Sequence, residues 1–253
     1  MAYKIKPDLN ISLIPTCRNL AKEWANSEKA DYFSELINCF SISEQNKIRF
    51  KYYLRKYLKK CVAQTFRYET NNAMLVIANK NDTITKSGFL QWLFDISKKH
   101  NKTIQNVDSY LNVERLLRRK FAVLLDEMPY RFKYFSAIKY HIATIESTVY
   151  NKSIRNYEAI NRTANFAATT SREGIKQPGF ILKNDMPTRK MFVVLEIDSI
   201  NHDKYKRIPI SRLWGQIAAE TIEDINADNR DNLSYNIDHA DMYEHNSKYV
   251  FRD

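Results

Sequence analysis

Glycine content is the feature that most restricts the fold, because only four of the 253 residues are glycine. Average usage would give about 18. Tight hairpins, glycine-rich phosphate loops and dinucleotide-binding turns need residues with positive φ or without a Cβ atom, so they are disfavoured here. The six prolines add few further interruptions. This composition favours long helices.

The spacing of apolar residues supports helices over most of the chain, since it follows a period of three to four residues. We expect about six of them, at 16–26, 30–40, 42–66, 88–100, 104–128 and 132–149. Residues 151–173 continue this pattern as a further helical segment. The apolar run in 71–82 is too short to distinguish a strand from the end of a helix.

The pattern changes after residue 173. Residues 174–189 contain two of the four glycines and two of the six prolines, which is typical of a linker or a long functional loop. Residues 191–197, MFVVLEI, are predicted to form the one clear strand, and 207–225 a final amphipathic helix. The fold class we expect is therefore mainly α, a multi-helix bundle with a small strand-containing C-terminal appendage.

This pattern divides the chain into four parts. We predict a basic helical domain at 1–173, a linker or long loop at 174–189, a strand-plus-helix appendage at 190–226 and an acidic tail at 227–253. The net charge of the whole chain is +11. Residues 220–253 carry nine acids and three bases, which leaves +17 on residues 1–219. A locally concentrated positive charge of this size favours a polyanionic partner.

The strongest concentration of positive charge is KIRFKYYLRKYLKKCV, residues 47–62, with seven Lys or Arg and no acid. On a helix, one half carries Phe50, Tyr53, Leu54, Tyr57, Leu58, Cys61 and Val62, and we expect that half to be buried. The other half carries Arg49, Lys51, Arg55, Lys56, Lys59 and Lys60. No acid lies one turn away to pair with these cations, so they repel one another. Nucleic-acid phosphates would relieve that repulsion. A solvated basic face and an anionic membrane surface are the alternatives.

Two further basic clusters support nucleic-acid binding. The segment ERLLRRK places Arg115, Arg118 and Arg119 on one helical face, and PYRFKYF interleaves Arg131 and Lys133 with tyrosines. Aromatic rings beside cations are suited to unpaired bases and their backbone. The predicted nucleic-acid-binding residues are Arg49, Lys51, Arg55, Lys56, Lys59, Lys60, Arg115, Arg118, Arg119, Arg131 and Lys133.

Two acidic groupings contain residue types that bind metal ions. The tail brings together side chains that ligate metals, namely His239, Asp241, Glu244 and His245. No apolar residues support this group, so we predict no metal there. Glu196 and Asp198 lie on one face of the expected strand, with Asp185 upstream, as in nucleases that hold Mg²⁺. Simple alternation of buried and exposed residues explains the same pattern.

No catalytic serine, cysteine or histidine arrangement and no phosphate-binding loop is identified, so we predict a non-enzymatic protein without a cofactor. Three cysteines without disulfide spacing, no signal peptide and no long apolar stretch indicate a cytoplasmic protein that does not contact membranes. The function we expect is nucleic-acid binding, as an accessory replication, recombination or regulatory factor of a phage or mobile element. The alternative is a virion or scaffolding component that self-associates through its amphipathic helices.

Overall fold

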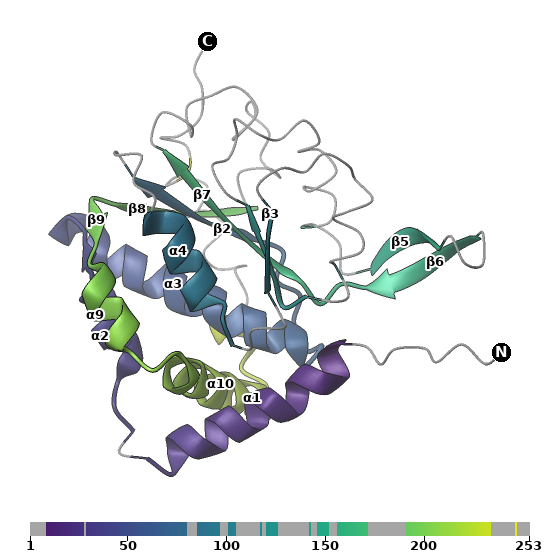
Figure 1. The fold of residues 1–253 in the computed structure, drawn as a ribbon. Helices are drawn as coiled ribbons and strands as arrows, with labels where there is room; N and C mark the ends of the chain where they lie inside the picture. The colour runs from purple at the N-terminus through teal and green to yellow at the C-terminus, as the bar shows by residue number, and fades with distance from the viewer. Residues whose placement is uncertain are drawn as a thin grey trace.

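A five-stranded parallel β-sheet forms the centre of the protein, as the computed structural model shows (Figure 1). The structure describes residues 9–27, 29–79, 85–96, 101–104, 117, 120–125, 142, 146–151, 156–171, 191–233 and 246. Within these residues, the helices and one face of the sheet share a single hydrophobic core.

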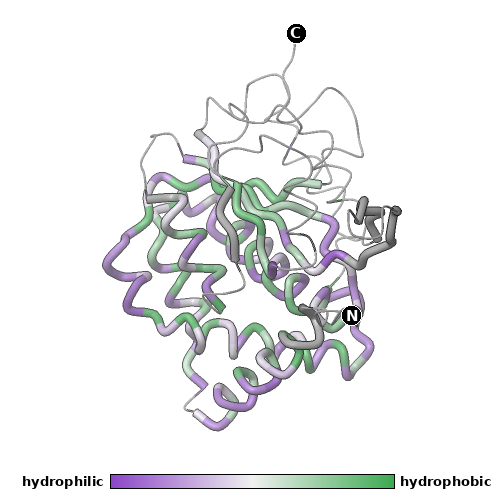
Figure 2. Tube along the Cα trace, turned by 45° about the vertical axis from the view of Figure 1, so that its right-hand side comes forward, coloured by the Kyte–Doolittle hydropathy of each residue, from purple (hydrophilic) through white to green (hydrophobic). Residues whose placement is uncertain are grey.

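The strands of the central sheet lie in an order that differs from their order in the chain. Across the sheet they are β3 (Asn101–Ile104), β4 (Ala122–Leu125), β7 (Asn165–Ser171), β2 (Met74–Asn79) and β8 (Phe192–Ile197). Every neighbouring pair is parallel. All six residues of β2 are buried, which is typical of a parallel strand covered on both faces. The hydrophobic colouring in Figure 2 is concentrated along these strands.

The helices come from both ends of the chain. Their bounds are α1 (Leu9–Ala25), α2 (Tyr32–Ile37), α3 (Glu44–Thr65), α4 (Thr85–Leu93), α9 (His202–Arg207), α10 (Ile210–Asn226) and the 3₁₀ helix η1 (Arg230–Asn232). Helix α10 packs against both α1 and α3. At Gly215 of α10, an added Cβ atom would lie 2.6 Å from the carbonyl oxygen of Leu20, so this close helix crossing requires glycine.

Two small antiparallel sheets complete the described structure. Strand β1 (Phe40–Ser41) pairs with β9 (Ser199–Ile200), which joins the segment before α3 to the segment after β8. Strands β5 (Glu146–Asn151) and β6 (Asn156–Asn161) form a hairpin. This hairpin extends away from the central sheet (Figure 1).

The prediction of a mainly α bundle is wrong, because the protein has a mixed α/β fold. The expected helix over 104–128 contains β4, and the expected helical continuation over 151–173 contains β6 and β7. The undecided run in 71–82 contains β2, and the predicted strand corresponds to β8. Because β8 pairs with β2, it belongs to the central sheet and is not part of an appendage. Short apolar strands fully buried in a parallel sheet lack the alternation that identifies a half-exposed strand.

The helix expected over 42–66 is confirmed as α3. Its predicted apolar half is buried, with Phe50, Tyr53, Leu54 and Tyr57 each no more than 2% exposed. The first helix begins seven residues earlier than expected, so that Pro15 lies inside it.

Candidate functional site

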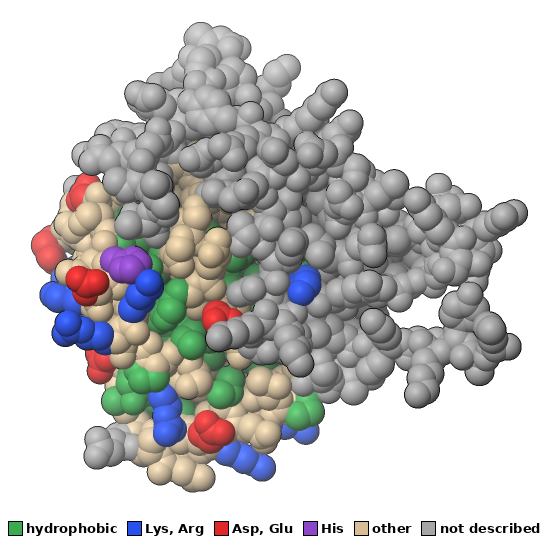
Figure 3. All heavy atoms as spheres, in the orientation of Figure 1, with side chains coloured by type: hydrophobic (Ala, Val, Ile, Leu, Met, Phe, Trp, Pro, Cys, Tyr) green, Lys and Arg blue, Asp and Glu red, His purple; other side chains and the backbone are tan. Residues whose placement is uncertain are grey.

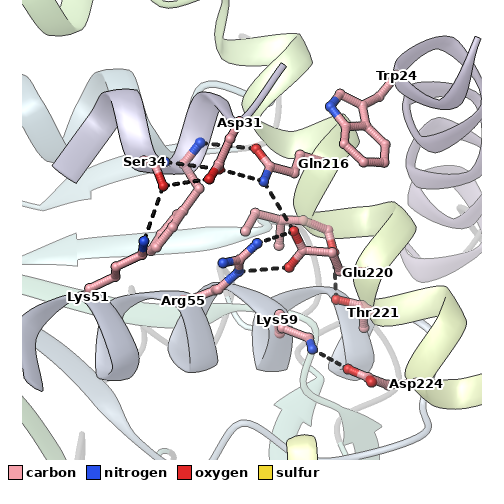
Figure 4. Close-up of polar contacts among 12 residues, drawn as sticks. Trp24, Asp31, Ser34, Lys51, Arg55, Lys59, Gln216, Glu220, Thr221 and Asp224 are labelled. Atoms are coloured by element: carbon pink, nitrogen blue, oxygen red, sulfur yellow. Dashed lines mark hydrogen bonds and ion pairs between the residues drawn. The ribbon is translucent and has the colours of Figure 1, made fainter. Parts of the chain in front are cut away.

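The cationic side of α3 faces the acidic side chains of α10 over part of its length. Arg55 donates from Nε to the Glu220 carboxylate at 2.8 Å, and a second guanidinium nitrogen donates to the other oxygen. This bond raises the pKa of Arg55. Glu220 also accepts from Gln216, whose side chain reaches Asp31 at 2.9 Å (Figure 4). These contacts join α2, α3 and α10.

Other predicted cations of α3 are also in polar contacts within the protein. Lys59 pairs with Asp224, and both side chains are 12% exposed. Lys60 is 1% exposed and lies 3.5 Å from the Glu69 carboxylate. Burial lowers the pKa of Lys60 to about 8, and the nearby Glu69 partly offsets that effect.

The three other predicted cations of α3 differ in exposure. Lys56 is 6% exposed, and its Nζ donates to the Tyr52 hydroxyl at 3.0 Å. Lys51 is exposed and donates to the Ser34 hydroxyl at 3.2 Å, and Arg49 is half-buried. The basic half identified from the sequence is therefore not fully exposed, because Lys56 and Lys60 are buried. On the face seen in Figure 3, Lys and Arg side chains are interspersed with Asp and Glu.

The remaining predicted nucleic-acid-binding residues cannot be placed in this way. They lie outside the described residues and are Arg115, Arg118, Arg119, Arg131 and Lys133. Nucleic-acid binding by any of the predicted residues remains a prediction.

A groove of about 440 Å³ lies along α3 where it faces η1. Its cationic lining is Lys51, Arg55, Lys56 and Lys59, and its remaining lining is Ile48, Tyr52, Asp231 and Asn232. Ile48 is 84% exposed and Tyr52 is 46% exposed. They are the exposed large hydrophobic residues of the described part of the chain.

A second candidate site lies where the parallel strands end. Strand β2 ends at the buried residue Asn79, residues 80–84 follow, and α4 then begins with Thr85, Lys86 and Ser87. A strand followed within a few residues by a helix whose second and third residues are Lys and Ser has the order of a phosphate-binding motif, whose pattern is GxxxxGK[ST]. In that alignment the lysine and the serine match. Lys80 and Thr85 stand where the pattern has glycine.

The topology of the sheet places the end of β2 at a position that favours ligands. The strand that follows β2 in the chain is β3, which lies at one edge of the sheet, past β7 and β4. The strand that follows β7 is β8, which lies at the opposite edge, past β2. The connections after the neighbouring strands β2 and β7 therefore leave in opposite directions. In open parallel sheets, ligands bind at the carboxyl ends of two such strands.

The adjoining strands supply polar residues to the same edge. Ala168 of β7 pairs with Leu125 of β4 on one side and with β2 on the other. The next residues of β7, Thr169 and Thr170, are buried. Asp126 directly follows Leu125 in the sequence and is itself followed by another acid. In P-loop proteins, an Asp that follows a buried strand of the same sheet helps hold Mg²⁺.

Sequence reasoning missed this edge because the search for a phosphate-binding loop required glycines. Two signals were present, the Lys86-Ser87 pair after a short apolar run and the acids that follow AVLL, residues 122–125. The second was assigned to the interior of an expected helix. The strand order, in which β7 lies between β2 and β4, is not visible in the sequence.

The structure describes only part of the two acidic groupings that contain possible metal ligands. Glu196 is half-buried in β8 and Asp198 is exposed just after it. Asp185 and the four tail residues, His239, Asp241, Glu244 and His245, lie outside the described residues. Among the described residues, no group of three or more His, Cys, Asp or Glu is placed to hold a metal ion. No described helix is both long and apolar enough to cross a membrane.

Comparisons with known proteins show the fold alone. No family model and no curated protein matches this chain. The A-form apo structure of the NrS-1 C-terminal region matches 90% of the chain with 13% identity and a TM-score of 0.51. A further apo structure of that region, residues 305–718, matches 86% with 13% identity and a TM-score of 0.53. The chain spans about half of each of those structures, 51% in both cases. Its fold is therefore similar to part of the NrS-1 C-terminal region.

Proposed function

We propose that this protein binds a nucleoside triphosphate together with Mg²⁺ at the carboxyl edge of its parallel sheet. The observation that carries the proposal is the start of α4 with Lys86 and Ser87, a few residues after the end of β2, the strand next to which the connections run in opposite directions. The amides at the start of a helix, together with the helix dipole, favour phosphate groups.

The residue types at this edge match the chemistry that a triphosphate requires. A lysine at the helix start neutralises the β- and γ-phosphates, and the hydroxyl that follows it is a Mg²⁺ ligand. Asp126, after β4, is the acid suited to the same metal ion. Lys86, Ser87 and Asp126 therefore supply the positive charge and the metal ligands.

The loop departs from the usual pattern at its two glycines. Glycine allows the backbone amides to approach the phosphates closely, whereas Lys80 and Thr85 each carry a Cβ atom. The charged and metal-binding positions are thus retained, while the positions that require no side chain are not. We therefore expect weaker binding than a glycine-rich loop provides.

Titration with a fluorescent ATP analogue, with and without Mg²⁺, tests this proposal. Because a charge-assisted hydrogen bond to phosphate is removed, Lys86→Ala should weaken binding by at least about 10-fold. Asp126→Asn should remove the Mg²⁺ dependence. Lys206→Ala, at an exposed position of α9, is the matched control and should bind as the wild type does.

Two results would refute nucleotide binding at this edge. One is wild-type protein that binds neither ATP nor GTP at millimolar nucleotide, and the other is a Lys86→Ala variant that binds as well as the wild type. That the protein is not an enzyme stays a prediction. Release of phosphate from ATP or GTP by the same preparation would contradict it.

Nucleic-acid binding is the second candidate function, and the β5–β6 hairpin favours it. Asn151 pairs with Asn156, so residues 152–155, Lys-Ser-Ile-Arg, link the two strands. The hairpin extends from the body of the protein (Figure 1). In the sequence, Lys152 and Arg155 lie between its two strands. Cations on a projecting element are suited to phosphate contacts with little dependence on base sequence. A role in a phage or mobile element, and the assembly-protein alternative, stay predictions.

Gel shift with single-stranded and duplex probes at two salt concentrations tests this function. Changing Lys152 and Arg155 together to Gln should weaken binding of both probes and reduce the salt dependence. The control changes Lys204 and Lys206, two exposed cations of α9, to Gln. Equal losses in the two double variants would mean that net charge, and not the hairpin, determines binding.

A further inference from the structure

The groove along α3 has an apolar side chain that projects beside it. Ile48 and Tyr52 are four residues apart, so they are neighbours on one face of the helix. Ile48 is 84% exposed, so it stands out from the groove that it lines. Lys56 holds the Tyr52 ring in place, because its ammonium group lies 5.2 Å from the ring centre and donates to the hydroxyl. A projecting apolar side chain therefore borders a groove whose aromatic wall is already ordered.

Three of the four cations that line the groove are held within the protein. Arg55 is paired with Glu220 of α10. Lys59 is paired with Asp224 of the same helix. Lys56 is 6% exposed. A molecule that enters the groove would therefore meet its apolar side chains at a surface with little net charge.

The two exposed charges of the groove have opposite signs and stand on opposite walls. Lys51 belongs to α3 and donates to the Ser34 hydroxyl at 3.2 Å, and the exposed Asp231 belongs to η1. Lys51 is three residues from Ile48, so the two are neighbours on the helix. A second α3 helix that placed its Ile48 in the groove would therefore bring its own Lys51 toward Asp231. The same surface thus contains both halves of an apolar contact and both halves of an ion pair.

We propose that this groove is a self-association surface, at which two copies of the chain meet around a twofold axis. Ile48 of each copy enters the groove of the other, and Lys51 of each copy pairs with Asp231 of the other. A twofold contact requires such a self-complementary patch, because the same residues meet from both sides. The balanced charge of the groove allows two copies to approach, although the whole chain carries +11. This inference goes beyond the nucleotide and nucleic-acid binding proposed above and depends on neither.

Analytical ultracentrifugation of the full chain, freed of nucleic acid, tests the proposal at concentrations up to about 500 μM, because small interfaces are weak. The mass should rise with concentration from 29.9 kDa towards the dimer and not beyond it. Ile48→Gln should weaken dimerisation at least about 100-fold, because each copy loses one apolar side chain from the contact. Lys206→Gln, at an exposed position of α9, is the control and should dimerise as the wild type does.

Charge reversal distinguishes a twofold contact from other kinds of association. Lys51→Glu and Asp231→Lys each place like charges opposite one another twice in a dimer. Each variant alone should therefore dimerise about 5- to 30-fold more weakly than the wild type. In an equimolar mixture of the two variants, both ion pairs form again across the contact, and dimerisation should return to nearly the wild-type level. That recovery would also show that both variants are folded.

Wild-type protein that stays monomeric over this range would overturn the proposal and favour an apolar segment of another protein as the occupant of the groove. Dimerisation that is unchanged in Ile48→Gln, or a mixture that recovers nothing, would overturn it as well. Growth beyond the dimer would do the same, because it requires a head-to-tail contact between copies.

Discussion

Replacing Arg55 by Gln tests whether the cations of α3 stabilise the fold. The two side chains of the Arg55–Glu220 pair are 33% and 21% exposed, between a surface pair and a buried one. Surface pairs contribute up to about 1 kcal/mol, and truncating one partner of a buried pair costs about 3–5 kcal/mol. For this half-buried, two-bond contact we expect a loss of about 2 kcal/mol, or about 4–8 °C in Tm for a domain of this size.

A double-mutant cycle with Glu220→Gln isolates the pair itself. Urea unfolding of the wild type, both single variants and the double variant should give a coupling energy of about 1–2 kcal/mol. Lys47 and Glu44 on the same helix are the matched control, at 3.3 Å with side chains 41% and 87% exposed. That exposed pair should couple by about 0.3 kcal/mol. If the two pairs couple equally, the Arg55–Glu220 contact stabilises the protein no more than an exposed pair does.

Three further predictions follow from buried residues. Lys60 has a folded-state pKa of about 8, below its usual 10.5. Between these two pH values the unfolded chain binds more protons than the folded protein, so the free energy of unfolding of the wild type should rise with pH. In urea unfolding, Lys60→Met should therefore be more stable than the wild type by up to about 3 kcal/mol near neutral pH, and by less near pH 10. A stability difference that does not change with pH would contradict this. Gly215→Ala, whose Cβ would meet a backbone oxygen of α1, should lower stability by about 1–3 kcal/mol in the same assay, whereas Gly88→Ala has open space and should be neutral or stabilising. Ending the chain after α10 removes the buried residues Leu233 and Asn246, so thermal unfolding should shift to lower temperature, and an unchanged Tm would contradict this.

Helix α3 shows how much of the fold could be predicted. Its 22 residues span several turns, so Phe50, Leu54, Tyr57 and Cys61 repeat often enough to identify the buried half. The central strands span only four to seven residues each, too few for a period to appear. Consequently β4 and β7 were assigned to helices.

The candidate sites were likewise predictable from the sequence only in part. The cations that line the groove were identified from sequence, because Lys51 and Lys56 stand out in an acid-free stretch. Tyr52 was not singled out, because its exposure depends on which side of α3 the other helices cover. Lys86 and Asp126, the residues of the proposed nucleotide site, were missed, because the ends of β2 and β4 come to one edge of the sheet only after both strands have paired with β7.

The sequence by itself determined the local properties of this protein, namely the buried half of α3, the strand character of residues 191–197 and the concentration of positive charge at 47–62. These follow from the period and the composition of short segments, which each segment carries wherever it is placed. Only the tertiary structure decided which strands are neighbours and whether the cations have partners. Arg55 meets Glu220 across 165 residues of sequence. Such a contact depends on the packing of α10 against α3, and the spacing of residues within one segment does not encode it.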